Sequence, residues 1–178
     1  MDWLRDLINR LLSVFPRVWI CSPAEAGVRI TFGKYVSTKG AGIYLFWPLV
    51  QRVIWMEIKT QVVDLRSQSV RTKCGNSVVV SGAIQYYITD VKRAILDVQD
   101  LDKSLTTLAL GIILEFVKQR TLEECRDVDV LKTEILKGIR DAAKGWGIKV
   151  ERVFITDLDK TRNIRLLTNG QSVTSNEE

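Results

Sequence analysis

The residue types that most enzymes and metal sites use are absent from this chain or too far apart to act together. It contains no histidine, which excludes Ser-His-Asp and Cys-His nucleophile arrangements, HExxH metalloproteases and histidine-containing zinc sites. Cys21, Cys74 and Cys125 are widely separated and form no CxxC pair, so neither a disulfide framework nor a cysteine-based metal site is expected. We therefore predict no metal, no cofactor and a reducing, cytoplasmic-side location.

Acidic residues, serines and lysines are plentiful, so the remaining enzyme hypothesis is a hydrolase with a carboxylate pair or a Ser-Lys pair. The chain has no GxSxG elbow, no P-loop and no dinucleotide-binding glycine motif. The run Gly40-Ala41-Gly42 lacks the third glycine and the helix start that a phosphate cradle needs. We predict that the protein is not an enzyme.

Composition favours a largely water-soluble body with an anionic neighbour. The 178 residues are 46% apolar and 26% charged, which is close to average globular usage and sufficient for one core. The net charge of +5 suits acidic lipid or nucleic acid, although an ordinary solvated basic surface would also explain it. No long Lys/Arg block, zinc-finger spacing or aromatic RNA-binding motif is present, so nucleic acid is not predicted as a partner.

The first twenty residues predict an amphipathic helix. If residues 2–15 are helical they extend about 21 Å, which is short of the roughly 30 Å hydrocarbon core of a bilayer. Pro16 follows, and no small-residue cleavage site marks a secretory signal. We expect the helix to lie in the membrane interface; the alternative is packing against its own domain. The predicted membrane-binding residues here are Trp3, Leu4, Leu7, Ile8, Leu11, Leu12, Phe15 and Trp19.

A second apolar run, Tyr44–Val50, follows the Lys39–Gly42 turn signal. It is either core or an interfacial wedge in which Phe46 and Trp47 contact the membrane, because aromatic rings suit headgroup depth. Cys21, beside the first segment, is a candidate for palmitoylation in a eukaryotic host.

The body of the chain changes from strand to helix periodicity near Asp90. Alternation predicts a central strand at Ser77–Ile88 with Val78, Val80, Gly82, Ile84, Tyr86 and Ile88 on one face. Shorter strands are expected at Gly27–Phe32, Ile43–Trp47, Val53–Lys59 and Val62–Leu65, and a returning strand at Ile148–Ile155.

Helices are expected at Val91–Leu96, at Asp102–Lys118 and from Asp127 onward, with Thr121 and Asp127 as N-caps. The last helix carries one apolar stripe, formed by Val128, Leu131, Ile135, Ile139, Ala142 and Trp146. Strands followed by helices and a returning strand predict an α+β domain, an antiparallel β meander with helices packed on it.

Three segments resemble the SPFH or band 7 family, which includes stomatin, prohibitin and flotillin. They are Glu25–Lys34 running into Lys39–Pro48; Val63–Arg66 with Thr72-Lys73 and Val78–Asp90; and Trp146–Val153 followed by Ile155 and Asp157. The last is similar to stomatins in particular. The resemblance implies an SPFH domain over residues 25–158, either one body or two subdomains, 25–65 and 66–158, between the helix of residues 1–20 and a C-terminal segment, 159–178.

By resemblance, the protein is expected to be a peripheral or monotopic membrane scaffold on the cytoplasmic face. The family builds ring-like homo-oligomers that organise lipid or membrane-protein microdomains and regulate partners such as a membrane protease or channel. The chain departs from stomatins after Asp157, where Asp159–Arg162 lacks their proline and no long Ala/Glu-rich coiled-coil helix follows.

Assembly is therefore expected to depend on the domain itself and on the apolar residues Ile164, Leu166 and Leu167. The alternative is a monomeric or dimeric membrane-surface adaptor that forms no ring.

Overall fold

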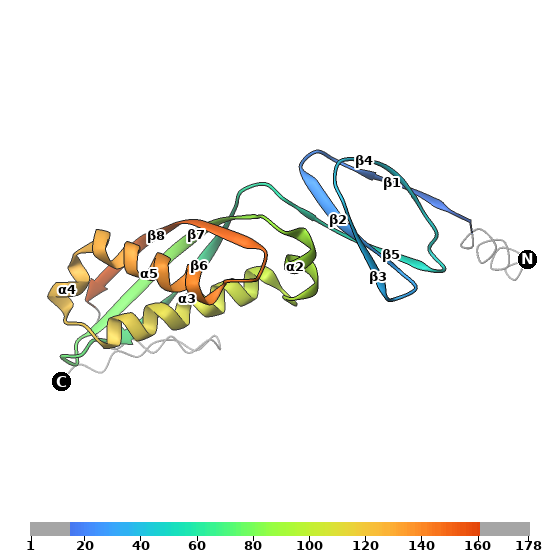
Figure 1. Cartoon of the computed structure of the whole chain (residues 1–178). Coiled ribbons are helices and arrows are strands. Elements are labelled where there is room, and N and C mark those ends of the chain that lie inside the picture. The colour runs from blue at the N-terminus through green and yellow to red at the C-terminus, as the bar shows by residue number, and fades with distance from the viewer. Residues whose placement is uncertain (1–14, 161–178) are drawn as a thin grey trace, which may run out of the picture.

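The structure, a computed structural model, describes residues 15–160, which form two lobes joined end to end (Figure 1). The first, called here the β lobe, contains β1 (Arg17–Cys21), β2 (Glu25–Thr31), β3 (Tyr35–Lys39), β4 (Gly42–Phe46) and β5 (Gln51–Glu57). The second, the α/β lobe, contains β6 (Gln61–Arg71), β7 (Ser77–Ile88), α2 (Val91–Leu96), α3 (Leu101–Lys118), α4 (Leu122–Arg126), α5 (Val128–Ala142) and β8 (Ile148–Lys160).

Strand β7 is the centre of the α/β lobe. It lies between β6 and β8 in an antiparallel three-stranded sheet. The predicted alternation is confirmed, because all six residues assigned to one face of β7 are buried. Val78, Val80, Ile84 and Tyr86 are at most 1% exposed, so this face forms the floor of the core.

Helices α3 and α5 cover that face of the sheet (Figure 1). Helix α2 has the predicted bounds, and α3 begins one residue earlier than predicted, after Asp100. Asp100 and Asp127 each accept a hydrogen bond from a first-turn backbone N–H, and Thr121 forms a capping box with Glu124. The predicted N-caps Thr121 and Asp127 are therefore confirmed, and the short α4 between them was not predicted.

The apolar stripe of α5 differs from the prediction at its end. Leu131, Ile135 and Ile139 are buried as expected, but Ala142 is exposed and Ala143 is buried in its place. Residue 143 is four positions after Ile139, which keeps it on the face that α5 turns toward the sheet.

The β lobe consists of two small antiparallel layers. Strands β3, β2 and β5 form one sheet with β2 in the centre, and β1 pairs with β4 as a two-stranded ribbon. Strands β1 and β3 were not predicted. Residues 17–20, which we assigned to the N-terminal helix segment, form β1 instead, since they follow Pro16 and find a partner in β4. The predicted helix over residues 1–14 lies outside the described residues.

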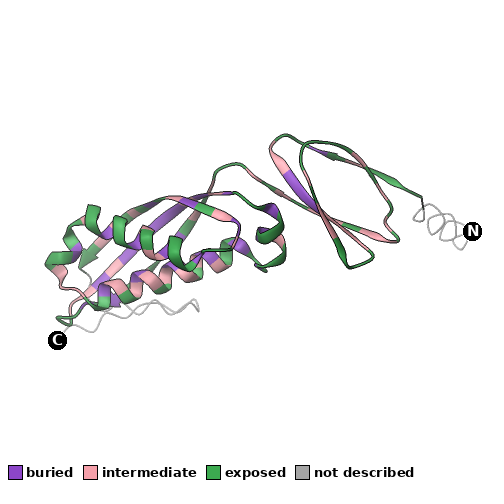
Figure 2. Cartoon of the chain, in the orientation of Figure 1, coloured by how far each residue is buried: buried purple, intermediate pink, exposed green. Residues whose placement is uncertain are grey.

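The two lobes meet where α2 packs against β2. Ala26 and Val28 of β2 belong to the same buried cluster as the α/β core. Figure 2 shows the contrast between the lobes: buried residues line the inner surfaces of the α/β lobe, whereas in the β lobe they are concentrated on β2.

Candidate functional site

The ribbon of β1 and β4 has one face that no other described part of the chain covers. Antiparallel register pairs Val18 with Leu45 and Ile20 with Ile43. These four side chains are 60–75% exposed, and together we call them the outer face. Directly paired apolar side chains contact each other across an antiparallel ribbon, so the outer face is a continuous apolar strip.

The opposite face of the ribbon is turned toward the rest of the β lobe. The Trp19 and Tyr44 rings lie 5.4 Å apart, centroid to centroid, and a Cβ on Gly27 would come within 2.6 Å of the Trp19 ring. Only glycine at position 27 leaves room for this ring. The ribbon is thus held on the sheet through its inner aromatic residues, and its outer aliphatic residues contribute little to the core of the lobe.

Four further apolar side chains lie at the end of the β lobe that is remote from α2. Phe15 precedes β1, Trp47 and Leu49 lie in the β4–β5 connection, and Phe32 lies in the β2–β3 turn. The Phe32 N–H donates to the Val50 carbonyl (2.8 Å), and Arg17 pairs with Phe46, which brings these segments to one end. The four side chains are 48–71% exposed, and we call them the tip.

This concentration of exposed apolar residues is confined to one lobe. Among residues 15–160, ten of the fourteen large apolar side chains that are exposed lie in the β lobe or at Phe15 just before it. The other four, Val62, Leu96, Val130 and Phe154, are scattered over the α/β lobe. Contiguous apolar patches of this kind mark sites of association with membranes or other proteins, whereas single exposed residues do not.

The sequence-predicted membrane-binding residues are divided by this geometry. Phe15 and Trp47 belong to the tip, whereas Trp19 and Phe46 are half-buried on the inner side of the ribbon. The run Tyr44–Val50 is therefore both core and surface, with its side chains alternating between the two. Trp3, Leu4, Leu7, Ile8, Leu11, Leu12, Ile164, Leu166 and Leu167 lie outside the described residues.

Several residues of the surface were missed by sequence reasoning. Val18, Ile20, Phe32 and Leu49 were not singled out, although Ile43 and Leu45 lay within predicted strand. The available signal was the period-2 alternation of Val18-Trp19-Ile20 against Ile43-Tyr44-Leu45. It predicts a ribbon with one aliphatic and one aromatic face once the two segments are paired. Cys21 is buried, with its Sγ 3.4 Å from the Glu25 carbonyl, so the structure does not present it for palmitoylation.

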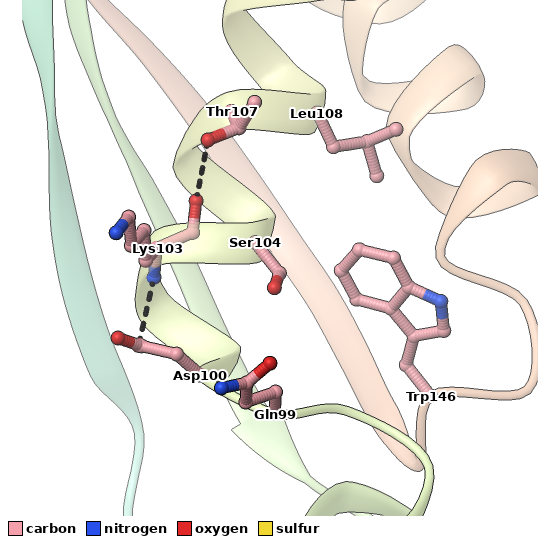
Figure 3. A pocket seen from close by; sticks show the side chains of 7 residues that line it. All are labelled: Gln99, Asp100, Lys103, Ser104, Thr107, Leu108 and Trp146. Carbon is pink, nitrogen blue, oxygen red and sulfur yellow. Dashed lines mark hydrogen bonds between the residues drawn. The ribbon is translucent and has the colours of Figure 1, made fainter.

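The α/β lobe offers hollows rather than a reactive site. A hollow of about 600 Å³ lies between the start of α3 and Trp146 (Figure 3), lined also by Gln99, Asp100, Lys103, Ser104, Thr107 and Leu108. The Asp100 carboxylate here accepts from the Lys103 N–H, so it caps α3 rather than serving as a base for Ser104. Within residues 15–160, no three His, Cys, Asp or Glu residues lie together as metal ligands would.

No helix of the described residues is both long enough and apolar enough to cross a bilayer.

Comparison with known proteins gives the family. A family model described as SPFH domain / Band 7 family matches residues 20–166. An uncharacterized protein of Archaeoglobus fulgidus is 27% identical over 164 residues, covering 92% of this chain and 66% of that protein. The stomatin homolog of Pyrococcus horikoshii is 24% identical over 154 residues (86% and 58%), and mouse stomatin 25% over 156 residues (83% and 55%).

The chain thus spans little more than half the length of the two stomatin relatives. Its match to the family model includes all five strands from β2 to β6, the central strand β7 and the helices that cover it. Membership of this family agrees with the mixed strand and helix fold and with association with a membrane. The chain belongs to the SPFH domain / Band 7 family.

Proposed function

We propose that this protein is a non-enzymatic scaffold of the membrane surface that binds the bilayer through its β lobe. The observation that carries the proposal is the uncovered apolar surface formed by the outer face and the tip. Burying one large aliphatic side chain in an apolar medium is worth roughly 1.5–3 kcal/mol. The outer face and the tip expose five aliphatic and three aromatic side chains, which provide a strong and non-specific attraction to the hydrocarbon boundary of a bilayer.

The same orientation supports a scaffold role. With the tip in the membrane, the α/β lobe lies at the far end of the molecule (Figure 1). Strands β6 and β8 are the outer strands of its sheet, each pairing with β7 on one side, and are our candidates for contact with neighbouring copies. We infer lateral homo-oligomers on the cytoplasmic face that organise lipids or membrane proteins, a membrane protease or channel among them.

The amphipathic segment of residues 1–20 adds to this attachment in our proposal. Its first fourteen residues precede Phe15 and β1 in the sequence, so an interfacial helix there would enter the bilayer beside the tip. Attachment would then be shared by a helix and by a folded β surface, and each contribution is separable by mutation.

Flotation with liposomes tests which surface binds. The double variant Ile43→Asp/Leu45→Asp places two carboxylates on the outer face. We expect its affinity for the liposomes to be at least about 100-fold lower than that of the unmodified chain. The matched control is Leu96→Asp with Val130→Asp, which makes the same chemical change at exposed positions of α2 and α5. The Ile8→Asp/Leu12→Asp pair tests the helix in the same assay.

The proposal requires the outer-face pair to bind more weakly than its control. If only the Ile8/Leu12 pair releases the protein, the helix is the anchor and the outer face serves another purpose. If the Ile43/Leu45 variant and the Ile8/Leu12 variant both bind as strongly as the unmodified chain, membrane attachment by the outer face and by the helix is excluded.

A further inference from the structure

The acidic residues that bound β2 and β5 lie at one end of the β lobe. The sequence has no aspartate or glutamate from residue 26 to residue 56, whereas Arg29, Lys34, Lys39 and Arg52 fall within this stretch. Glu25 and Glu57, which bound it, are paired with each other across β2 and β5. This pair marks one end of the β3-β2-β5 sheet, and the pair Thr31–Gln51 marks the other.

The acidic end of the sheet faces the α/β lobe, and the tip lies at the other end. The Gln61 side chain at the start of β6 donates to the Glu57 carbonyl (2.9 Å), which places the two glutamates at the junction of the lobes. Thr31 lies six positions after Glu25 in β2, a distance of about 20 Å at the usual rise per residue. Acidic side chains are thereby kept away from the surface that carries the exposed apolar residues.

Three exposed basic side chains surround the tip. Arg17 is paired with Phe46, Lys34 follows the β2–β3 turn, and Arg52 is paired with Ile30 beside the Thr31–Gln51 end of the sheet. A surface that enters a bilayer while contacting its headgroups has apolar side chains at its centre and cations around them. The tip has this arrangement.

Phe32 gives independent support, because its backbone conformation is unfavourable for phenylalanine. Phe32 and Gly33 have φ values of 50° and 68°, and the Lys34 N–H donates to the Thr31 carbonyl (3.1 Å). Turns with positive φ at both central residues favour Asn, Asp and Gly, and a bulky side chain there is strained. Phe32 is 70% exposed, so packing within the chain does not explain why an aromatic ring occupies this position.

We propose that the tip inserts into a leaflet containing anionic phospholipid, with Phe32, Trp47 and Leu49 entering the interface and Arg17, Lys34 and Arg52 binding phosphate or carboxylate groups of the headgroups. This inference rests on the proposed membrane attachment and adds a charge preference to it. A second copy of the chain is a poorer occupant for the tip, since two tips would bring like charges together.

The test measures binding of the full chain to two kinds of vesicle, phosphatidylcholine alone and phosphatidylcholine with phosphatidylserine, at low and high salt. A basic residue near an anionic surface strengthens binding about five-fold, so Lys34→Gln with Arg52→Gln should weaken binding to the anionic vesicles by about 25-fold. Binding of this pair to the neutral vesicles should be unchanged. The control is Lys118→Gln with Lys137→Gln, which removes the same charge from exposed positions of the α/β lobe.

Phe32→Asn provides a second measurement. Asparagine suits the turn, so this variant should unfold at a higher denaturant concentration than the unmodified chain and yet bind both vesicles more weakly. A gain in stability combined with a loss of binding shows that the phenylalanine serves the membrane and not the fold.

The outcomes separate this inference from the proposed function. Preference for the anionic vesicles that high salt and the Lys34/Arg52 pair both remove supports it. Equal binding to both vesicles, or equal losses in the pair and its control, overturns the charge preference and leaves attachment standing. Absence of binding to either vesicle overturns both. An unchanged affinity in Phe32→Asn overturns insertion of this turn.

Discussion

At the scale of single residues, Tyr86 of β7 forms a polar contact within the α/β lobe. Its ring is 1% exposed, and its hydroxyl lies within hydrogen-bonding distance of the Gln61 Oε1 (2.8 Å) and the Asp102 carboxylate. The contact therefore joins the start of β6, the central strand and the first turn of α3. Burial, together with hydrogen bonding to the Asp102 carboxylate and the charge of that carboxylate, raises the pKa of Tyr86 well above its usual value of 10.0.

We predict that Tyr86→Phe lowers the free energy of unfolding by about 1–3 kcal/mol, because the Asp102 carboxylate loses the hydroxyl that donates to it. A raised pKa in the folded state means that the tyrosine contribution is complete below pH 10 and is lost as pH rises above it. The unmodified chain should therefore lose stability above pH 10 more steeply than Tyr86→Phe. Urea unfolding at pH 7 and pH 10.5 measures both effects.

Tyr87→Phe is the matched control for this change. Tyr87 is half-buried on the opposite face of β7, where the Lys149 ammonium lies 5.8 Å from its ring centroid. Its hydroxyl is not needed for that contact, so the substitution should change stability by less than about 0.5 kcal/mol. Equal losses in the two variants would show that the Tyr86 hydroxyl has no special role.

At the scale of elements, two helical glycines have opposite surroundings. A Cβ at Gly111 of α3 meets nothing within 4 Å, whereas one at Gly138 of α5 comes 3.1 Å from Ile112 Cγ2. Alanine in an exposed helix interior is more stable than glycine by about 0.5–1 kcal/mol. We predict that Gly111→Ala stabilises the protein by this amount.

Gly138→Ala should gain less or lose stability, because the added methyl group presses on Ile112 between α3 and α5. Thermal unfolding of the two variants side by side checks the prediction. If Gly138→Ala is as stabilising as Gly111→Ala, the two helices are free to move apart at this contact.

Elements with a strong local signal could be predicted from the sequence, and those defined by a distant partner could not. The alternation of β7 involves only neighbouring residues, and the caps Thr121 and Asp127 bond to backbone N–H groups three residues later. Both features could therefore be predicted from short stretches of sequence. Strand β1 has only five residues and depends on β4 for its hydrogen bonds. The alternation of Val18-Trp19-Ile20 therefore indicates a strand only once β4 is recognised as its partner.

The candidate site shows the same division. Phe15 was predicted from the apolar stripe of the N-terminal segment, and Trp47 from its aromatic ring in an apolar run beside a glycine-rich turn. Phe32 was assigned to the end of a strand. Its proposed role depends on a turn conformation, and the only sequence signal for that turn is the following Gly33. Trp19 was expected at the membrane surface. Its ring instead packs over Gly27, eight residues later in the sequence, where the absence of a side chain leaves room for it.

At the scale of the whole molecule, the choice between ring scaffold and small adaptor depends on assembly. Strands β6 and β8 run antiparallel to β7 and therefore parallel to each other, on opposite edges of one sheet. A contact between the β8 side of one copy and the β6 side of the next would be head-to-tail, which is the arrangement that closes into rings. Several membrane-binding tips on one particle would then raise avidity well above that of one copy.

The start of β8 is already engaged within its own chain. The Arg140 guanidinium of α5 donates to the Val150 and Glu151 carbonyls at 2.8 and 3.1 Å. We therefore place the proposed contact on the later part of β8, which carries the exposed Phe154 and leads to the segment containing Ile164, Leu166 and Leu167.

The structure also changes where the chain should be cut to test this contact. The sequence predicted a strand ending at Ile155, and a cut after Asp157 would leave such a strand whole. However, β8 continues to Lys160, and Leu158, Asp159 and Lys160 pair with Val80, Val79 and Val78. Because a cut after Asp157 would remove these three pairs from beside β7, it would confound loss of assembly with loss of folding.

Truncation after Lys160 retains all the pairs of β8 and removes the apolar residues of the C-terminal segment. We predict that this variant keeps its unfolding transition and binds lipid, but forms smaller particles than the unmodified chain when its mass is measured on lipid or in detergent. Replacing Ile164, Leu166 and Leu167 with serine in the full-length chain should have the same effect, since it is the apolar contact and not the length of the segment that matters. Particles of unchanged mass in both variants would exclude this segment from the interface, and an unmodified chain that is monomeric or dimeric on lipid would establish the adaptor in place of the ring.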